Sequence, residues 1–548
     1  MTRGLAGLLP RWADYREVPR SWRRDLLAGV TVGVVALPLA LAFGVSSGAG
    51  AASGLVTAII AGVIAAVFGG SNVQVSGPTG AMVVVLGPVI ATHGITVLPL
   101  VCVMAGAIVL LAGMLRLGNA VTFIPWPVIE GFTLGIAVII FLQQIPAALG
   151  VVAGHSSNAA IAAIEAAGTV DLGPMWWSLA VAAGVAAIMV LAPKLHRALP
   201  GSIIAIIVVT VLVVMFRVPV PTIGELPTSL PAPILPIGDP ATVLALVGPA
   251  FTIAALAAIE SLLSARVAAS ISDTGPYDAD RELVGQGLAS LGSGLFGGMP
   301  ATGAIARTAV NIRSGARTRL AAIVHSLILL IVVYVASTVV SIIPLAALSG
   351  VLMVTAIRMI SLTTVRTILR STRSDAAVFV ITAVITVSVD LIYAVGIGIL
   401  AAAFFTLRRL ANSAGVHREE LPPPAEPGDE RIAVFRLDGA LFFGAAERIV
   451  TGIGTIQNVS VVILRLSGLQ VLDATGAQVL TELVHTLERR GITVLIKGIP
   501  PEHLQLATRI GVIASLRHHN HLYTDLAPAI AHARSHIQRD IGIDSKPA

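Results

Sequence analysis

Glu260 and Arg307 are charged residues in segments that are otherwise apolar. A charge near the bilayer centre costs about 2.5–3.5 kcal/mol on insertion scales, so such a residue usually faces a cavity or a partner. The two could form an ion pair that only joins two helices, or Arg307 could reach the membrane surface. We expect a functional site instead, because Arg307 follows a Pro/Gly break by one to two helical turns. Ser264, one turn after Glu260, is a further candidate for this site.

A Thr-Gly-Ala sequence occurs twice, at 79–81 and at 302–304, with an offset of 223 residues. Each copy closely follows a proline, Pro78 or Pro300, and opens a short apolar segment. Either break alone could be a simple kink in a helix. A helix that begins inside the membrane, however, points unpaired N–H groups into a cavity and carries roughly half a positive charge at its N-terminus.

Two such ends together with Arg307 sum to roughly two positive charges, which suits a small anion, including a divalent one. The residues that we expect to bind this anion are Thr79, Gly80, Ala81, Ser264, Gly303, Ala304 and Arg307.

Glu260 has a second possible role, as a proton carrier. An apolar cavity favours the neutral carboxyl, whereas Arg307 and the helix ends favour the carboxylate. A carboxyl balanced between these effects can bind and release a proton. We expect proton entry at Glu260 to compensate for the negative charge of the anion.

The elements around these residues are apolar over most of the chain. Of 548 residues, 56% are hydrophobic and only 12% are charged, and the mean hydropathy is +0.91. Charges are sparse from Asp25 to about Leu410, which leaves room for about 12 to 14 membrane spans. The predicted segments are 26–45, 53–70, a short one from Pro78, 97–115, 123–145, 176–192, 200–216, 244–268, 283–298, a short one from about 303, 318–342, 345–357, 375–390 and 391–410.

The distribution of arginine and lysine favours 14 crossings. With the N-terminus in the cytoplasm, nearly all basic residues fall in cytoplasmic connections, and Arg217 is the main exception. The net charge of +6 therefore indicates membrane topology and not nucleic-acid binding. Residues 1–25 are a basic cytoplasmic segment, in which Trp12 and Trp22 suit an interfacial helix rather than a cleaved signal.

Residues 26–410 form the predicted transport domain. The paired, interrupted segments are typical of an inverted-repeat transporter, and seven segments per half would invert the second copy.

A soluble α/β domain is expected at residues 431–548, after a linker at 411–430. Its strands are predicted at 431–435, 459–466 and 492–497, with an amphipathic helix from Gly476 to Arg490. The helix follows an Asp473-Ala-Thr475-Gly sequence. This loop resembles the phosphorylatable loop of STAS domains, with Thr475 at the phospho-acceptor position. We favour the simpler role of Asp473 as the N-cap of the helix.

A multispan block that ends in a STAS domain resembles the SulP family of anion transporters. Three motifs carry the resemblance: Ala-Leu-Pro38-Leu-Ala in the first span, Ser-Gly-Pro78-Thr in the third, and the sequence from Pro300 to Asn311. The family implies an α-helical membrane protein with 14 segments in a 7+7 inverted repeat, divided into core and gate domains. It also implies an elevator-like motion, a homodimer and no cofactor.

The resemblance extends to single residues. Arg307 matches the family's anion-binding arginine, Glu260 matches the position that couples to protons, and Phe43 matches an aromatic residue beside the substrate. Sodium-coupled bicarbonate members differ, because they have Asp where Glu260 stands, a hydroxyl where Ile305 stands, and no arginine at 307. Many sulfate permeases have Gln where this chain has Leu39.

The leading hypothesis is a proton-coupled anion transporter of a bacterial inner membrane, with the N-terminus and the STAS domain in the cytoplasm. Its partners would be protons, the lipid bilayer, a small anion and a second copy of the chain. Sulfate is the expected substrate by its frequency in the family, and bicarbonate or a fumarate-like dicarboxylate is the alternative.

A hypothesis of another class is a regulatory membrane protein whose STAS tail switches by phosphorylation. A nucleobase transporter is disfavoured by that tail, and no motif indicates an enzyme. No metal site is expected, since His518, His519 and His521 lie in a surface-like stretch.

Overall fold

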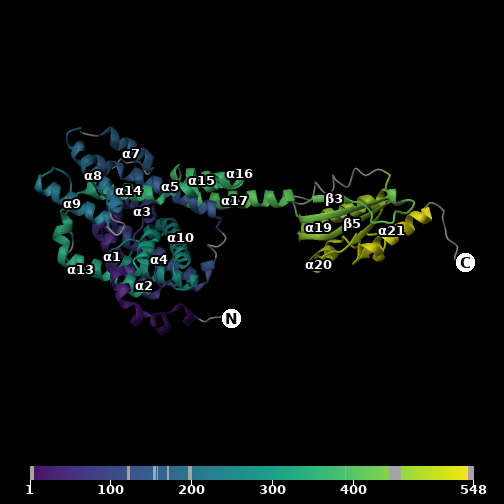
Figure 1. Ribbon diagram of the computed structural model, residues 1–548, viewed down its shortest axis with the longest axis horizontal. Coiled ribbons are helices and arrows are strands. Elements are labelled where there is room, and N and C mark those ends of the chain that lie inside the picture. The colour runs from purple at the N-terminus through teal and green to yellow at the C-terminus, as the bar shows by residue number, and fades with distance from the viewer. Residues whose placement is uncertain are drawn as a thin grey trace. The chain divides into compact units, whose positions relative to one another are not determined.

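The computed structural model describes residues 5–119, 124–151, 156, 158–169, 172–195, 200–226, 228–388, 391–413, 415–442 and 458–540. Parts of the predicted N-terminal segment (1–4) and STAS domain (443–457 and 541–548) therefore lie outside the described residues. The chain forms two compact units, Met1–Ile399 and Leu400–Ala548 (Figure 1).

The first unit is helical. Fourteen helices among the described residues correspond to the 14 predicted segments, and the last of them runs on into the second unit. They are α1 (Val18–Ser46), α2 (Ala51–Phe68), α3 (Gly80–His93), α4 (Leu98–Met114), α5 (Trp126–Gln143), α8 (Leu172–Leu195), α9 (Gly201–Met215), α10 (Pro240–Ile271), α11 (Ala279–Leu295), α12 (Ile305–Arg313), α13 (Leu320–Ser341), α14 (Leu345–Met359), α16 (Arg373–Ser388) and α17 (Leu391–Ser413).

Eight helical stretches in the described part of the chain are long and apolar enough to cross a membrane. Shorter apolar helices include α3 and α9, as expected for segments that cross only part of the bilayer or pack inside the protein. In the described part of the first unit, three further α-helices were not predicted: α6 (Ile145–Leu149), α7 (Ala159–Gly168) and α15 (Leu362–Arg370).

The N-terminal segment differs from the predicted single interfacial helix. It forms two 3₁₀ turns, Leu5–Leu8 and Trp12–Tyr15, before α1 begins at Val18. Trp12 is 92% exposed. Asp14 forms an ion pair of 2.7 Å with Arg281 at the start of α11, which holds this segment against the helical unit.

The helices pack in two groups. In the core group, α4 and α2 lie along α11, α1 lies along α13, and α10 contacts α3, α4 and α12. In the gate group, α5 lies along α16, and α8 packs on both α9 and α14. Figure 1 shows α1, α2, α4 and α10 gathered together and α7, α8 and α9 beside one another. The groups meet where α1 and α3 contact α5, α9 and α14, and this is the core-and-gate division that the resemblance predicts.

Glycine allows the closest contact within the core group. A Cβ atom on Gly106 of α4 would lie 2.7 Å from the Leu291 nitrogen, and one on Gly287 of α11 would lie 2.5 Å from the Leu110 nitrogen. The two backbones therefore touch, as in membrane helix pairs built on small residues. Such contact makes α4 and α11 a rigid base for the segments that they support.

The second unit is an α/β domain with a five-stranded sheet in the order β3-β4-β5-β6-β7. The strands are β3 (Gly415–Glu419), β4 (Ile432–Leu441), β5 (Val461–Leu472), β6 (Thr493–Lys497) and β7 (Leu522–Tyr523), and only the β3–β4 pair is antiparallel. Strand β3 lies in the predicted linker and forms an edge of the sheet.

Alternating side chains of the sheet face two layers of helices. Ala433 and Phe435 join the cluster that contains α19 (Ala474–Arg489) and α20 (Pro501–Ile510). Ile432 and Val434 join the cluster that contains α21 (Leu526–Asp540).

Candidate functional site

Two short buried strands pair inside the helical unit, and this pair is called the crossing below. Strand β1 (Ser76–Gly77) pairs antiparallel with β2 (Thr302–Gly303), so that Ser76 lies opposite Gly303 and Gly77 opposite Thr302. Helix α3 begins at Gly80, within the first Thr-Gly-Ala break, and α12 begins at Ile305, directly after the second. The structure thus brings the two predicted helix ends together, although 223 residues separate the copies in the chain.

Arg307 lies beside the crossing, and only 2% of it is exposed. Its Nη2 donates to the Pro78 carbonyl oxygen. Its Nη1 is buried and has no hydrogen-bond partner among the described residues. A buried guanidinium N–H without an acceptor is costly, so this donor is suited to an anion at the crossing.

Gly77 makes room for that guanidinium. A Cβ atom at this position would lie 2.7 Å from Arg307 Nη1 and 3.3 Å from the Ala58 Cα. Sequence reasoning missed Gly77, because only the tertiary structure places it beside Arg307.

Glu260 also contacts the crossing and is half-buried on α10. Its Oε2 accepts hydrogen bonds of 2.8 Å from both Thr79 and Thr302. The two threonine oxygens are 3.0 Å apart. Thr302 was not among the predicted ligands, although the offset of 223 residues pairs it with Thr79 and could have identified it.

Ser264 has a supporting position in this structure. It is fully buried, and its Oγ lies 3.4 Å from Thr308 Oγ1. Thr308 Oγ1 accepts a hydrogen bond from the Val75 nitrogen, and the neighbouring Ser261 Oγ accepts one from the Gly303 nitrogen. These bonds attach α10 and α12 to the crossing strands and do not involve Arg307.

The two helix ends are covered to different extents. Phe43 of α1 lies beside the start of α3, because a Cβ atom on Gly80 would be 3.5 Å from its Cε1 and 2.2 Å from Ile140 Cδ1 of α5. Ala81 is buried, as is Ala304, whereas Ile305 in the first turn of α12 is 42% exposed. The gate group therefore covers the α3 end, and the α12 end is open.

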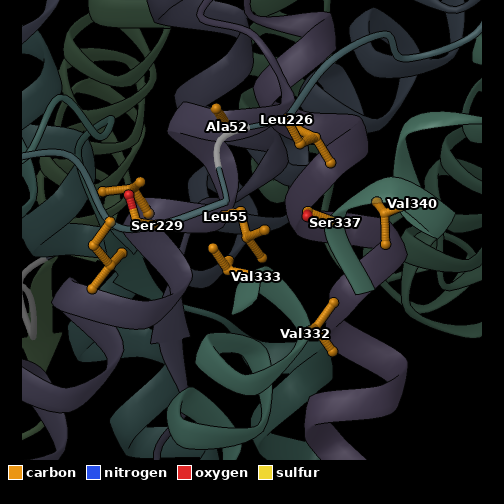
Figure 2. Close-up of a pocket in the computed structure, with 10 residues that line it drawn as sticks. Ala52, Leu55, Leu226, Ser229, Val332, Val333, Ser337 and Val340 are labelled. Atoms are coloured by element: carbon orange, nitrogen blue, oxygen red, sulfur yellow. The ribbon is translucent and has the colours of Figure 1, made fainter. Parts of the chain in front are cut away.

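A separate apolar pocket lies away from this site (Figure 2). It is lined by Ala52 and Leu55 of α2, by Leu226 in a connecting segment, and by Val333 and Ser337 of α13, among others. None of the crossing residues lines it and it has no charged group, so we do not assign the anion to this pocket.

The comparisons with known proteins agree with this geometry. Residues 22–382 match the Sulfate permease family, and residues 424–529 match the STAS domain. The chain belongs to the sulfate permease family. Like other members of the family it is a membrane anion transporter and not an enzyme.

Relatives of this family member include both sulfate and bicarbonate transporters by name. "Putative sulfate transporter YvdB" of Bacillus subtilis is 34% identical over 90% of this chain and 94% of its own length. The bicarbonate transporter BicA of a Synechocystis species is 31% identical over 87% of this chain and 88% of its own length.

Two solved structures share the fold. The murine anion transporter Solute Carrier 26 family member A9, in an inward-facing state, aligns with a TM-score of 0.84 and 17% identity over 98% of this chain and 96% of its own. The transmembrane domain of a cyanobacterial BicA aligns with a TM-score of 0.61 and 32% identity over 70% of this chain and 97% of its own.

The STAS domain of this sulfate permease family member has its candidate phosphorylation loop at the start of α19. Asp473 Oδ1 accepts a hydrogen bond of 2.7 Å from the Gly476 nitrogen, which confirms the N-cap interpretation. Thr475 is exposed in the first turn of the helix. A cap does not exclude phosphorylation of Thr475, so that role stays a prediction.

Proposed function

We propose that this chain is a secondary active transporter that carries sulfate together with protons across a bacterial inner membrane. The observation that supports it best is the buried Nη1 of Arg307, which has no hydrogen-bond partner among the described residues and lies where two helix N-termini meet. Charge-assisted hydrogen bonds from a guanidinium and partial positive charge from helix ends both favour an anion.

Proton coupling is supported by the hydroxyl groups around Glu260. Thr79 and Thr302 each have one hydroxyl proton, and both can be donated to Glu260 Oε2 when the carboxyl is ionised. A Glu260 protonated on Oε2 can instead donate its own proton to one threonine, after which Thr302 can donate to Thr79 at 3.0 Å. The charge on Glu260 can thus change the direction of the hydrogen bonds at the crossing that we propose to position the anion.

An elevator-like mechanism is supported by the two helix groups. The crossing, Arg307 and Glu260 all belong to the core group, whereas α5 of the gate group covers the start of α3. Movement of the core group along the gate group would carry the complete anion site from one side to the other. A 7+7 inverted repeat, a homodimer and a cytoplasmic STAS domain belong to the same proposal.

Bicarbonate is the second candidate, with a fumarate-like dicarboxylate as a further alternative. It is favoured by the 31% identity to BicA and by the apolar Leu39 and Phe43 on α1. Arg307 favours proton coupling over sodium coupling, because its buried guanidinium repels a nearby cation.

The test is uptake of labelled sulfate, bicarbonate or fumarate into proteoliposomes that contain the purified full-length chain. Each anion is offered with an inward proton gradient, with an inward sodium gradient, and with neither. We expect sulfate uptake to rise at least tenfold with the proton gradient alone. Uptake of bicarbonate and not of sulfate would support bicarbonate as the substrate in place of sulfate. Stimulation of uptake by the sodium gradient would contradict proton coupling.

Glu260→Gln separates coupling from binding. Because a glutamine amide can still bond Thr79 and Thr302, we expect anion exchange to continue while the effect of the proton gradient is lost. Glu130→Gln is the matched control, since this carboxylate on α5 bonds Trp126 and does not contact the crossing. Undiminished proton-driven uptake by Glu260→Gln would exclude Glu260 as the proton carrier.

A further inference from the structure

Three histidines of the STAS domain converge on one point. His521 ends a 3₁₀ turn, His519–His521, directly before β7, and His532 and His536 lie one turn apart on α21. One ligand nitrogen from each lies within 4.8 Å of the other two. The ring centroids are separated by 4.8 to 5.7 Å.

The distances resemble those of a metal site. His532 Nε2 and His536 Nε2 are 3.2 Å apart. Two nitrogens on one tetrahedral zinc ion lie about 3.3 Å apart for Zn–N bonds of about 2.0–2.1 Å. The longest separation in the group must close by about 1.5 Å, which a change of side-chain torsion can provide.

His521 provides the second, independent observation. It is only 1% exposed, and its Nδ1 has no hydrogen-bond partner among the described residues. A buried imidazole nitrogen without a hydrogen-bond partner is available to bind a metal ion.

The neighbouring charged side chains do not block the ligand nitrogens of the three histidines. Arg517 pairs with Glu488, and the Arg539 Nε donates to the Ser535 carbonyl, so neither guanidinium occupies the nitrogens. The Tyr523 ring lies 5.9 Å from that of His532. Asp540, on the last turn of α21, pairs with Arg431.

We propose that His521, His532 and His536 form a binding site for a divalent transition metal, with zinc as the best match. Imidazole nitrogen is a preferred ligand of zinc, nickel and copper. Three histidines leave a fourth position for water or for His518, whose exposed ring lies 5.4 Å from that of His521. A bound ion would join α21 to the β7 edge of the sheet.

Zinc titration of the full-length chain in detergent, after treatment with a chelator and desalting, tests this site. Calorimetry should show one Zn²⁺ per chain, and Co²⁺ in its place should give the visible absorption of a tetrahedral site. We expect His532→Gln and His536→Gln to weaken binding at least 100-fold. His519→Gln is the matched control, because this exposed neighbour lies outside the group, and it should bind as the parent does.

A fold control accompanies each variant. His532 and His536 are only half-buried, so their variants should elute and melt like the parent without metal, whereas zinc should raise the melting temperature of the parent and of His519→Gln alone. Less than one equivalent of zinc in the parent would overturn the proposal. So would equal losses in His519→Gln and His532→Gln, which would indicate nonspecific binding by surface histidines.

Discussion

Arg307 is useful to an anion only because of the residues beside it. Its guanidinium is held by the Pro78 carbonyl and fits against the Cα hydrogens of Gly77, while Nη1 stays free of protein acceptors in the described part of the chain. Glu260 accepts hydrogen bonds from the Thr79 and Thr302 hydroxyl groups of the crossing. Its charge can therefore influence the candidate anion site without Glu260 being a ligand of the anion. In the proposed mechanism, anion binding and proton response therefore belong to separate residues, Arg307 and Glu260, beside the same pair of strands.

Gly77→Ala should weaken anion binding at least tenfold. The new methyl group would meet Arg307 Nη1 at 2.7 Å, and the end of a flexible side chain yields more readily than backbone. The guanidinium would then leave the position in which it meets the anion. The measurement is the Kd of sulfate for the purified variant, together with its melting temperature.

Gly297→Ala is the matched control for backbone strain. Gly297 also has a positive φ, of 73°, but a Cβ atom there meets nothing within 4 Å. Its substitution should cost stability and leave sulfate affinity unchanged. Equal loss of affinity in both variants would mean that strain, and not displacement of Arg307, explains the effect at Gly77.

At the scale of elements, α21 is attached to the rest of the STAS domain by an apolar face, by the exposed Arg431–Asp540 ion pair and by Arg534. Arg534 donates from Nε and Nη2 to the two carboxylate oxygens of Asp429, at 2.9 and 2.8 Å, and from Nη1 to Glu426. Arg534 and Asp429 are mostly buried, with side chains 16% and 13% exposed. The hydrogen bond from Arg534 lowers the pKa of Asp429 against the opposing effect of burial.

Arg534→Gln should loosen α21 by about 1.5–3 kcal/mol, the usual contribution of hydrogen bonds to charged groups. Amide hydrogen exchange of the full-length chain should then be roughly tenfold faster or more in α21 near pH 7. Arg539→Gln is the control, because in the described part of the chain Arg539 donates hydrogen bonds only to Ser535 of its own helix.

The sign of the pH dependence follows from the lowered pKa of Asp429. Stability from this pair is complete above the unfolded aspartate value of about 3.9 and is lost as pH falls through the lower folded value. After correction for intrinsic exchange, the difference between parent and Arg534→Gln should be constant from about pH 7 to about pH 5 and should shrink below about pH 4. A difference that already shrinks near pH 6 would assign the effect to another group.

At the scale of the whole molecule, the two units separate the candidate functions. Every predicted anion ligand and Glu260 lie in the unit Met1–Ile399, whereas Thr475 and the histidine cluster lie in Leu400–Ala548. Each unit has its own hydrophobic clusters. Binding of the anion and regulation through the STAS domain can therefore be tested independently.

Deletion of residues from 415 onward should leave the sulfate Kd within about twofold, because distant independent sites couple weakly. The transport rate or the assembly state should fall if the tail supports a carrier. Arg307→Ala in the shortened chain is the control and should abolish the remaining binding. Loss of sulfate binding on deletion alone would contradict a site that is complete within the first unit.

Hydropathy, the clustering of arginine and the repeated Thr-Gly-Ala sequence predicted the 14 segments at which the structure has helices, the positions of both breaks and the candidate roles of Glu260 and Arg307. These features are local, because a span must be apolar along its own length and a charge inside it is conspicuous wherever it packs. Helices α6, α7 and α15 were missed because they are short or lie in connections, where periodic signals are weak.

Only the tertiary structure decided which residues meet. Thr79 touches Thr302 across 223 residues, Gly77 makes room for Arg307, and His521 meets two histidines of α21. The spacing of His532 and His536 on one helix face was visible in the sequence, but their partner was not. A contact between distant segments depends on how whole elements pack, and no pattern within either segment specifies that packing.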